Sequence, residues 1–287
     1  MLKRVDSTIE FARACELCGS HSATEIEHYT KGKWPVVECG DCGFVFLGEV
    51  PPYSALVEEF AWEKTFETEK KRRRKSRFGW LDAVTRYRTR LGHVMDHQRR
   101  ARTLGMTGNV LDVGCGVNCR IPDGPTPFGI EISAALAKQA APSFEQRGGR
   151  VVHAPATEGF DDFPDGFFSA VLMRSFLEHE SQPRLVLQRA FRKLAPGGAI
   201  YVRVPDYGSV NRRLMGSKWC GFRFPDHVNY FTSRSLRKLA ENVGFVYSRT
   251  NWLSAFDDNI IAVLKKPTRM TSNLHERQIG YPWIVTN

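Results

Sequence analysis

Short apolar runs alternate with segments of helical periodicity from residue 109 to residue 265, and this alternation restricts the fold more than any other feature of the chain. The runs expected to form strands are 109–113, 128–132, 150–153, 167–173, 199–204, 245–251 and 260–265. Helices are expected over about 181–194 and over 232–243, which Thr232 can cap and Gly244 can end. Strands that alternate with helices favour a parallel sheet covered on both faces. The sequence therefore predicts an α/β, doubly wound, Rossmann-like sheet of seven strands.

The first of these strands ends in a glycine turn, in which Asp112 and Val113 are followed by Gly114, Cys115 and Gly116. Glycines at such a turn let backbone N–H groups approach a ligand closely. Glu131 ends the second strand, where a doubly wound sheet presents an acid to ribose hydroxyls. A pyrophosphate would be repelled by the Asp112 carboxylate, whereas that carboxylate attracts the ammonium and sulfonium of S-adenosylmethionine. The turn therefore favours S-adenosylmethionine over a dinucleotide.

Residues 109–265 resemble the class I S-adenosylmethionine-dependent methyltransferases. Besides the glycine turn, the resemblance is carried by Gly129-Ile130-Glu131-Ile132-Ser133, Phe163-Pro164-Asp165-Gly166-Phe167-Phe168, Leu177-Glu178-His179 and Leu194-Ala195-Pro196-Gly197-Gly198. It implies that Gly114 and Gly116 face the methionine part of the cofactor, that Glu131 faces the ribose, and that Ala156 and Thr157 border the adenine. The full set of expected cofactor-binding residues is Asp112, Gly114, Cys115, Gly116, Glu131, Ile132, Ala156, Thr157 and Arg174, the last toward the cofactor carboxylate.

The segment after the glycine turn departs from that family. Asn118 stands in place of a third glycine, and Pro122, Pro125 and Pro127 would break the helix that usually follows. Asn tolerates a left-handed backbone, so the turn itself can be kept. Cys115 and Cys119 are expected to line the cofactor loop.

Four of the seven cysteines form two pairs near the N-terminus, at Cys15, Cys18, Cys39 and Cys42. A glycine follows each pair and lets backbone N–H groups turn toward the sulfurs. In a reducing compartment this spacing indicates metal ligands rather than disulfides. Four thiolates suit a closed tetrahedral zinc site, so the predicted zinc is structural.

With this module the chain resembles a methyltransferase subfamily with an N-terminal zinc ribbon, which includes C-methyltransferases of nucleotide-linked deoxysugars. Those enzymes carry a Tyr and a Glu-His pair in the loop after the fifth strand. The resemblance implies that Phe224, Asp226 and His227 take these places, with His227 as a catalytic base and Asp226 fixing its tautomer. Losing the tyrosine hydroxyl favours oxygen over carbon methylation. Asp206 and Tyr207 are further candidates for the pocket.

The formal net charge of +10 is concentrated in residues 64–102, which hold 14 Lys and Arg against four acidic residues. A helical period begins at Trp80 within this basic segment. The expected organisation is a zinc module in 1–50, a connector with a basic amphipathic helix in 51–105, the cofactor-binding domain in 106–266 and a tail in 267–287. No apolar run suits a signal peptide or a membrane span, so a cytoplasmic protein is expected.

The preferred prediction of function is O-methylation of an anionic, sugar-containing small molecule or glycan. A second hypothesis is an RNA methyltransferase that binds nucleic acid through residues 64–102, although Met173-Arg174-Ser175-Phe176 lacks the Asn/Asp-Pro-Pro-Tyr element typical of many such enzymes. A third is a non-catalytic scaffold that uses the zinc module and basic surfaces for assembly and binds S-adenosylmethionine weakly or not at all. Cofactor affinity separates the third hypothesis from the first two.

Overall fold

The computed structural model describes residues 9–10, 13–50, 104, 106–251 and 258–268. The predicted connector and basic helix lie outside the described residues, apart from Leu104. Most of the predicted tail also lies outside them. None of the described helices is long and apolar enough to cross a bilayer.

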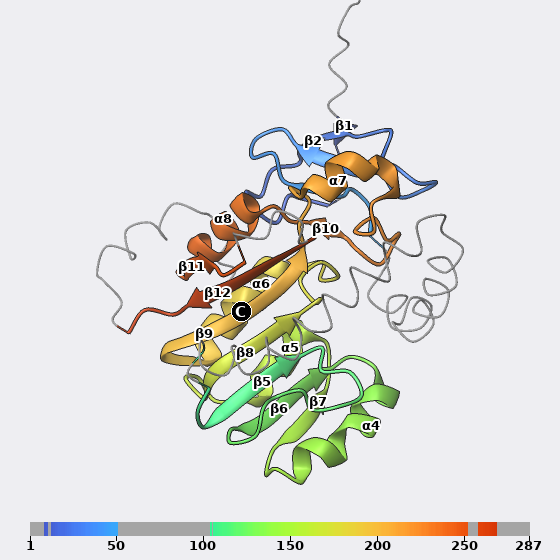
Figure 1. The fold of residues 1–287 in the computed structure, drawn as a ribbon. Coiled ribbons are helices and arrows are strands. Elements are labelled where there is room, and N and C mark those ends of the chain that lie inside the picture. Colours follow the sequence, from blue (N-terminus) through green and yellow to red (C-terminus); the bar gives the residue numbers. More distant parts are fainter. Residues whose placement is uncertain (1–8, 11–12, 51–103, 105, 252–257, 269–287) are drawn as a thin grey trace, which may run out of the picture.

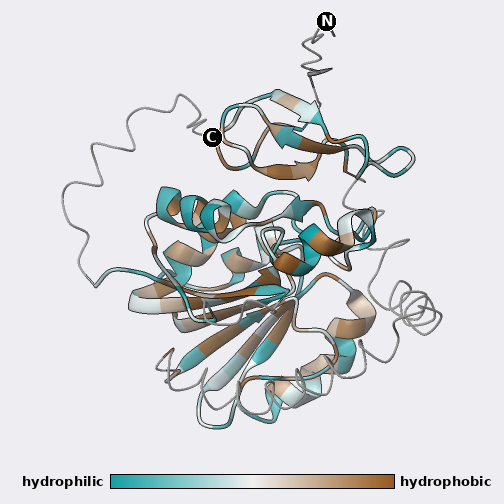
Figure 2. Ribbon diagram, turned by 45° about the horizontal axis from the view of Figure 1, so that its top comes forward, coloured by the Kyte–Doolittle hydropathy of each residue, from teal (hydrophilic) through white to brown (hydrophobic). Residues whose placement is uncertain are grey.

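A seven-stranded sheet forms the centre of the molecule and confirms the predicted fold class (Figure 1). Its strands are β5 (Asn109–Val113), β6 (Thr126–Glu131), β7 (Arg150–His153), β8 (Phe168–Arg174), β9 (Leu194–Pro205), β11 (Val246–Arg249) and β12 (Asn259–Lys265). They lie in the order β11-β12-β9-β8-β5-β6-β7. Hydrophobic residues follow these strands, as expected of a sheet buried on both faces (Figure 2).

One edge of the sheet differs from the predicted parallel arrangement. Strands β5 to β9 are parallel, but β12 runs antiparallel to both β9 and β11. Only residues 250–258 join β11 to β12, which is too short for the helical crossover that a parallel pair requires. The sheet is therefore mixed.

Helices cover both faces of this sheet. Helix α4 (Ala134–Glu145) packs on β6 and β7, and its Phe144 joins a core that includes Val110. The opposite core includes Leu111 and receives α5 (Ala156–Gly159), the 3-10 turn η1 (Phe160–Asp162), α6 (Pro183–Lys193) and α8 (Ser233–Val243). Successive residues of a strand point to opposite faces, so Val110 and Leu111 serve different cores.

The four-cysteine module forms a second, antiparallel sheet (Figure 1). Its strands are β1 (Ile9–Glu10), β2 (Ser22–Glu25), β3 (Val36–Cys39), β4 (Val45–Leu47) and, from far along the chain, β10 (Asn229–Tyr230). Strand β10 pairs antiparallel with β4, Asn229 opposite Phe46 and Tyr230 opposite Val45. The loop between β9 and α8, which also carries α7 (Val210–Met215) and the 3-10 turn η2 (Gly216–Lys218), therefore completes the sheet of the module.

Candidate functional site

The glycine turn after β5 has a backbone that side chains rarely adopt. Gly114 and Gly116 have φ values of 67° and 68°. A Cβ on Gly114 would lie 3.2 Å from the Phe176 ring, whereas a Cβ on Gly116 would meet nothing within 4 Å. The turn therefore needs glycine at both positions and leaves open space at Gly116, where a ligand can approach the backbone.

Glu131 lies at the end of β6, directly beside this turn. Its Oε2 accepts the Gly116 N–H at 2.9 Å, and its Oε1 accepts the Ser133 N–H at 3.0 Å. The residue is buried. Each carboxylate oxygen keeps a second lone pair, so Glu131 can hold the turn and still accept a ribose hydroxyl.

Asp112 and Arg174 form an ion pair at the carboxyl ends of the adjacent strands β5 and β8. The Asp112 side chain is buried, and the Arg174 Nε is buried without a hydrogen-bond partner among the described residues. Asp112 and Arg174, expected to attract the ammonium and the carboxylate of the methionine part, thus already contact each other. A zwitterionic amino-acid group suits such a pair of opposite charges, so these residues fit S-adenosylmethionine.

The side chain of Cys115 does not line the cofactor loop as expected. It is buried in the core beneath the turn, where its Sγ would lie 2.8 Å from a Cβ on Gly129. Burial raises the pKa of this thiol. Any contact of Cys115 with the cofactor would come from its backbone. Cys119, also expected to line the loop, is partly buried, and Arg147 Nη1 donates to its Sγ at 3.4 Å.

The predicted absence of the usual helix after the turn is confirmed, since no helix lies between β5 and β6. Arg147 holds this segment in place of helical hydrogen bonds, donating to the carbonyl oxygens of Ile121, Pro122 and Pro125 at 2.5 to 3.2 Å. Of the other expected cofactor-binding residues, Ile132 comes just after β6. Ala156 and Thr157, expected at the adenine, begin α5 after β7.

The four cysteines of the module come together as predicted. The sulfurs of Cys15 and Cys42 are 3.5 Å apart, as are those of Cys18 and Cys39. Zinc–sulfur bonds of about 2.3 Å in a tetrahedron place sulfurs about 3.8 Å apart. The cluster has the ligand number and spacing that a tetrahedral metal ion requires.

A second polar cluster lies where the end of β8 meets the loop before β10. It consists of Glu178, His179, Asp226 and His227, and the Glu178 backbone carbonyl accepts the Val228 N–H at 2.8 Å. The rings of His179 and His227 are 4.7 Å apart and nearly perpendicular. The cluster therefore brings together the loop that carries Asp226 and His227 and the segment Leu177-Glu178-His179.

The hydrogen bonds in this cluster correct the expected link between Asp226 and His227. The Asp226 carboxylate contacts Nδ1 of His179 at 2.9 Å, while Nδ1 of His227 bonds to the Gly221 carbonyl oxygen at 2.8 Å. Asp226 thus orients His179, and a backbone carbonyl orients His227. The His227 N–H also donates to the Arg223 carbonyl oxygen at 2.7 Å, so the chain turns back toward Gly221 at this point.

Burial and neighbouring charges shift the pKa values of three side chains in this cluster. Burial, together with the neighbouring His179, lowers the pKa of His227 well below its usual value. Burial alone would raise the pKa of Asp226, but His179 lowers it to about 2. Burial raises the pKa of the Glu178 carboxyl.

A cavity of about 400 Å³ opens between the four-cysteine module and the segment after β9. Its polar and aromatic lining includes Tyr29, Tyr207, Arg212 and Tyr230. Arg212 donates to the Tyr29 hydroxyl at 3.1 Å and lies 4.2 Å from the centre of the Tyr207 ring. The Tyr230 hydroxyl is buried without a partner among the described residues. Tyr207 therefore lines this cavity, whose lining includes no residue of the glycine turn.

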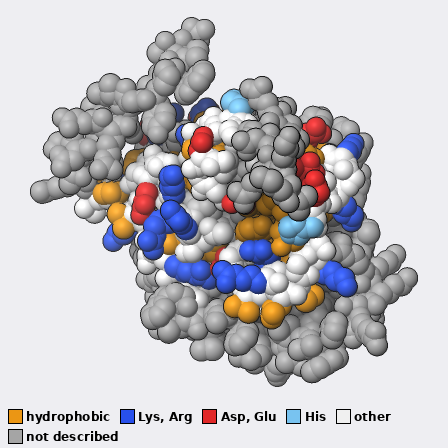
Figure 3. Space-filling view, turned by 90° about the horizontal axis from the view of Figure 1, so that it is seen from above, with side chains coloured by type: hydrophobic (Ala, Val, Ile, Leu, Met, Phe, Trp, Pro, Cys, Tyr) orange, Lys and Arg blue, Asp and Glu red, His pale blue; other side chains and the backbone are white. Residues whose placement is uncertain are grey.

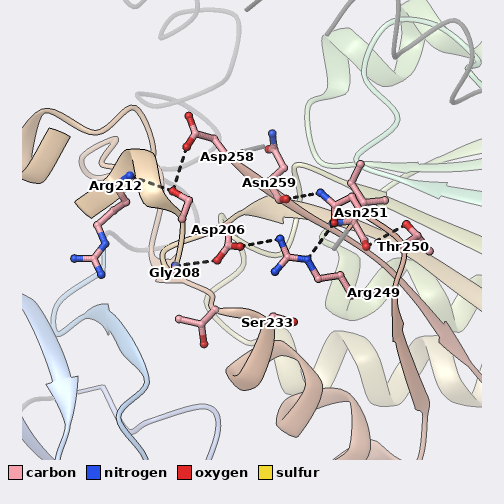
Figure 4. Close-up of polar contacts among 12 residues, drawn as sticks. Asp206, Gly208, Arg212, Ser233, Arg249, Thr250, Asn251, Asp258 and Asn259 are labelled. Carbon is pink, nitrogen blue, oxygen red and sulfur yellow. Dashed lines mark hydrogen bonds and ion pairs between the residues drawn. The ribbon is translucent and has the colours of Figure 1, made fainter. Parts of the chain in front are cut away.

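Asp206 belongs to a structural network instead. Its carboxylate lies 3.0 Å from Arg249 Nη2 and accepts the Gly208 N–H at 2.8 Å (Figure 4). Nearby, the Ser209 hydroxyl donates to Asp258 at 3.1 Å. These contacts tie the turn before α7 to β11 and to the start of β12.

Comparison with known proteins matches a methyltransferase domain over most of the chain. A family model described as a methyltransferase domain matches residues 75–249, more than half of the chain. An uncharacterized protein of Methanocaldococcus jannaschii is 27% identical over 139 residues, which cover 48% of this chain and 64% of that protein, less than two thirds of its length. Ubiquinone biosynthesis O-methyltransferase of Psychrobacter arcticus is 26% identical over 224 residues, covering 67% of this chain and 83% of that protein.

Among solved structures, a SAM-dependent methyltransferase from Archaeoglobus fulgidus aligns with a TM-score of 0.45 at 17% identity, covering 60% of this chain and 93% of that chain. The family match spans the glycine turn, Glu131 and the Asp112–Arg174 pair described above. The chain belongs to the class I S-adenosylmethionine-dependent methyltransferases.

Proposed function

We propose that this protein transfers the methyl group of S-adenosylmethionine to a hydroxyl oxygen of an anionic, sugar-containing acceptor. The observation that carries the proposal is the polar cluster of Glu178, His179, Asp226 and His227, whose Glu178 follows the Phe176 ring beside Gly114. The cofactor supplies an activated methyl on its sulfonium. The chain binds the cofactor, orients the acceptor oxygen and assists the loss of its proton.

Local geometry supports placing this cluster at the reacting end of the cofactor. The Phe176 ring lies against Gly114, and Glu178 follows Phe176 by two residues. Arg174, two residues before Phe176 at the end of β8, contacts Asp112. In doubly wound sheets, substrates bind at this carboxyl edge. An acceptor above the glycine turn would thus face the cluster.

His227 is the proposed catalytic residue, and Asp226 and His179 are proposed to position it; the sequence alone did not assign His179 to catalysis. His227 has its Nδ1 engaged by Gly221, so Nε2 is the atom left to assist at the acceptor hydroxyl. Asp226 acts through His179 and is therefore a positioning residue. Phe224 has no hydroxyl, which supports oxygen rather than carbon as the methylated atom.

The rest of the acceptor would occupy the cavity beside the four-cysteine module. Arg212 and Glu38 both line this cavity, and its tyrosines offer flat apolar faces with hydroxyls at their ends, as sugar rings require. In the view from above, Lys and Arg side chains gather in a row on the described surface (Figure 3). This basic row supports an anionic acceptor.

Zinc in the Cys15, Cys18, Cys39 and Cys42 cluster would then be structural. Four thiolates leave no open position for a substrate. The module would serve the reaction by fixing β10, which directly follows the catalytic loop.

The test compares His227→Ala with the unmodified protein. Calorimetry should show nearly unchanged S-adenosylmethionine affinity, whereas methyl transfer to the best acceptor from a panel of nucleotide-linked and lipid-linked sugars should fall by about 100-fold or more. Asp226→Asn should reduce turnover less, because it acts through His179. His21→Ala, an exposed histidine of the module, is the matched control.

Two results would contradict the proposal. Full turnover by His227→Ala would remove His227 from catalysis, and loss of cofactor binding in that variant would make it a structural residue. An unmodified protein that binds no S-adenosylmethionine would instead favour the scaffold hypothesis. Methylation of RNA but of no sugar in the panel would identify a different acceptor class.

A further inference from the structure

We propose that Glu178, His179 and His227 bind a divalent transition-metal ion, separate from the four-cysteine site. One ligand atom from each of these residues lies within 4.8 Å of the others. Two ligands bonded at about 2.1 Å to a tetrahedral ion lie about 3.4 Å apart, so small side-chain movements bring the three around one ion.

The hydrogen bonds outside this group prepare both histidines as ligands. Asp226 accepts from Nδ1 of His179, and the Gly221 carbonyl accepts from Nδ1 of His227. Each ring is therefore left with an unprotonated Nε2 when it is neutral. A carboxylate or a carbonyl on the far nitrogen is the usual support of a metal-bound histidine. Both neighbouring rings have such a support on Nδ1, which leaves both Nε2 atoms available to one ion.

Glu178 supplies the independent evidence for an ion. Glu178 is 1% exposed, and its Oε2 has no hydrogen-bond partner among the described residues. Oε1 lies 4.0 Å from Nε2 of His179, beyond hydrogen-bond length. A buried carboxylate oxygen without a hydrogen bond is costly, and a cation between Oε2 and two neutral imidazoles removes that cost.

Two histidines and one carboxylate favour zinc or another first-row divalent ion and leave coordination positions open. The His179 side chain is 25% exposed, so the open side is accessible. The role of the ion in catalysis rests on the proposed function, but its binding does not. With the ion bound, Nε2 of His227 would be a ligand and no longer the base that assists in the metal-free site, so the acceptor hydroxyl would bind the ion and release its proton to solvent. The oxygen lone pair would then attack the methyl carbon, and the carbon–sulfur bond electrons would return to sulfur.

Cobalt(II) distinguishes the two sites in the full-length protein without any acceptor. The unmodified protein should bind two equivalents, of which only one shows sulfur-to-metal charge transfer and the other shows weak ligand-field bands alone. Glu178→Gln, which keeps the shape of the side chain, should keep the thiolate signal and bind the second ion at least about 100-fold more weakly. His227→Ala should do the same, and His21→Ala should still bind two.

Thermal unfolding provides a second measurement that does not depend on spectra. The second equivalent should raise the melting temperature of the unmodified protein but not that of Glu178→Gln, since an ion that binds only the folded state stabilises it. A single, thiolate-bound equivalent in the unmodified protein would overturn the inference, as would two unchanged equivalents in Glu178→Gln. Neither result bears on S-adenosylmethionine affinity or methyl transfer, which are measured separately, so the metal inference can fail while the proposed function stands.

Discussion

At the scale of single residues, the cofactor end of the sheet depends on two buried acids with different partners. Asp112 is neutralised by Arg174 from the neighbouring strand, whereas Glu131 is held by backbone N–H groups of the turn that it supports. Asp112 requires the opposite charge of Arg174, whereas Glu131 requires both of its carboxylate oxygens. Substitutions should reveal this difference.

Arg174→Ala should lower the free energy of unfolding by about 3–5 kcal/mol, because it leaves the Asp112 carboxylate buried without its cation. The double variant Arg174→Met with Asp112→Asn removes both charges and should recover much of that loss. Urea unfolding measures both. If the single variant is as stable as the unmodified protein, the pair is not closed in solution.

Glu131→Ala should weaken S-adenosylmethionine binding by about 1–3 kcal/mol, because the ribose hydroxyls and the Gly116 N–H lose their acceptor. Glu131→Gln keeps one acceptor oxygen and should lose less. Isothermal calorimetry with the cofactor measures both. Equal affinities for all three proteins would show that Glu131 does not contact the ribose.

At the scale of elements, α8 links the central sheet to the four-cysteine module. Thr232 and Ser235 form a capping box at its start, and Gly244 ends it with a φ of 106°. Its Leu236 and Leu239 share a core cluster with Phe46 of the module. The sequence signals at both ends of this helix were sufficient to place it.

Thr232→Ala should cost about 1 kcal/mol of stability, because the Ser235 N–H at the start of α8 loses its side-chain acceptor. Thr232→Ser keeps that acceptor and should cost much less. Chemical denaturation followed by circular dichroism gives both values. A Thr232→Ser variant as unstable as Thr232→Ala would assign the effect to the lost methyl group instead.

At the scale of the whole molecule, the four-cysteine module and the catalytic domain share their packing. Strand β10 completes the sheet of the module, and Leu47 of the module lies in one core with Trp219 and Tyr230. Arg13 adds hydrogen bonds to the Val228 carbonyl at 2.9 Å and the Asn229 side chain at 2.8 Å. Loss of the module should therefore disturb the loop that carries Asp226 and His227.

Metal analysis should find zinc in the four-cysteine site, and Cys39→Ser should lose that zinc and unfold residues 1–50. Because Trp219 is only 1% exposed and packs beside the module, its fluorescence should shift to the red in that variant. Subtracting the signal of matched Trp219→Phe proteins isolates this change among the six tryptophans. A metal-free protein with the native Trp219 signal would contradict the structural role of zinc.

Local patterns in the sequence determined most of the central fold. Strand and helix periodicity, the Thr232 cap and the paired cysteines act over a few residues, so they could be recognised without a structure. The seven strands, the α8 boundaries and the gathering of Cys15, Cys18, Cys39 and Cys42 were predicted in this way. The prolines after the glycine turn also correctly excluded a helix there.

Only the tertiary structure decided which distant groups meet. The antiparallel β12, the pairing of β10 with β4 and the turn of Cys115 into the core depend on packing between segments far apart in the chain. The partner of Asp226 is His179, 47 residues earlier, and not the adjacent His227. Sequence neighbours on a bent loop point in different directions, so adjacency along the chain identified the residues of the site but not their contacts.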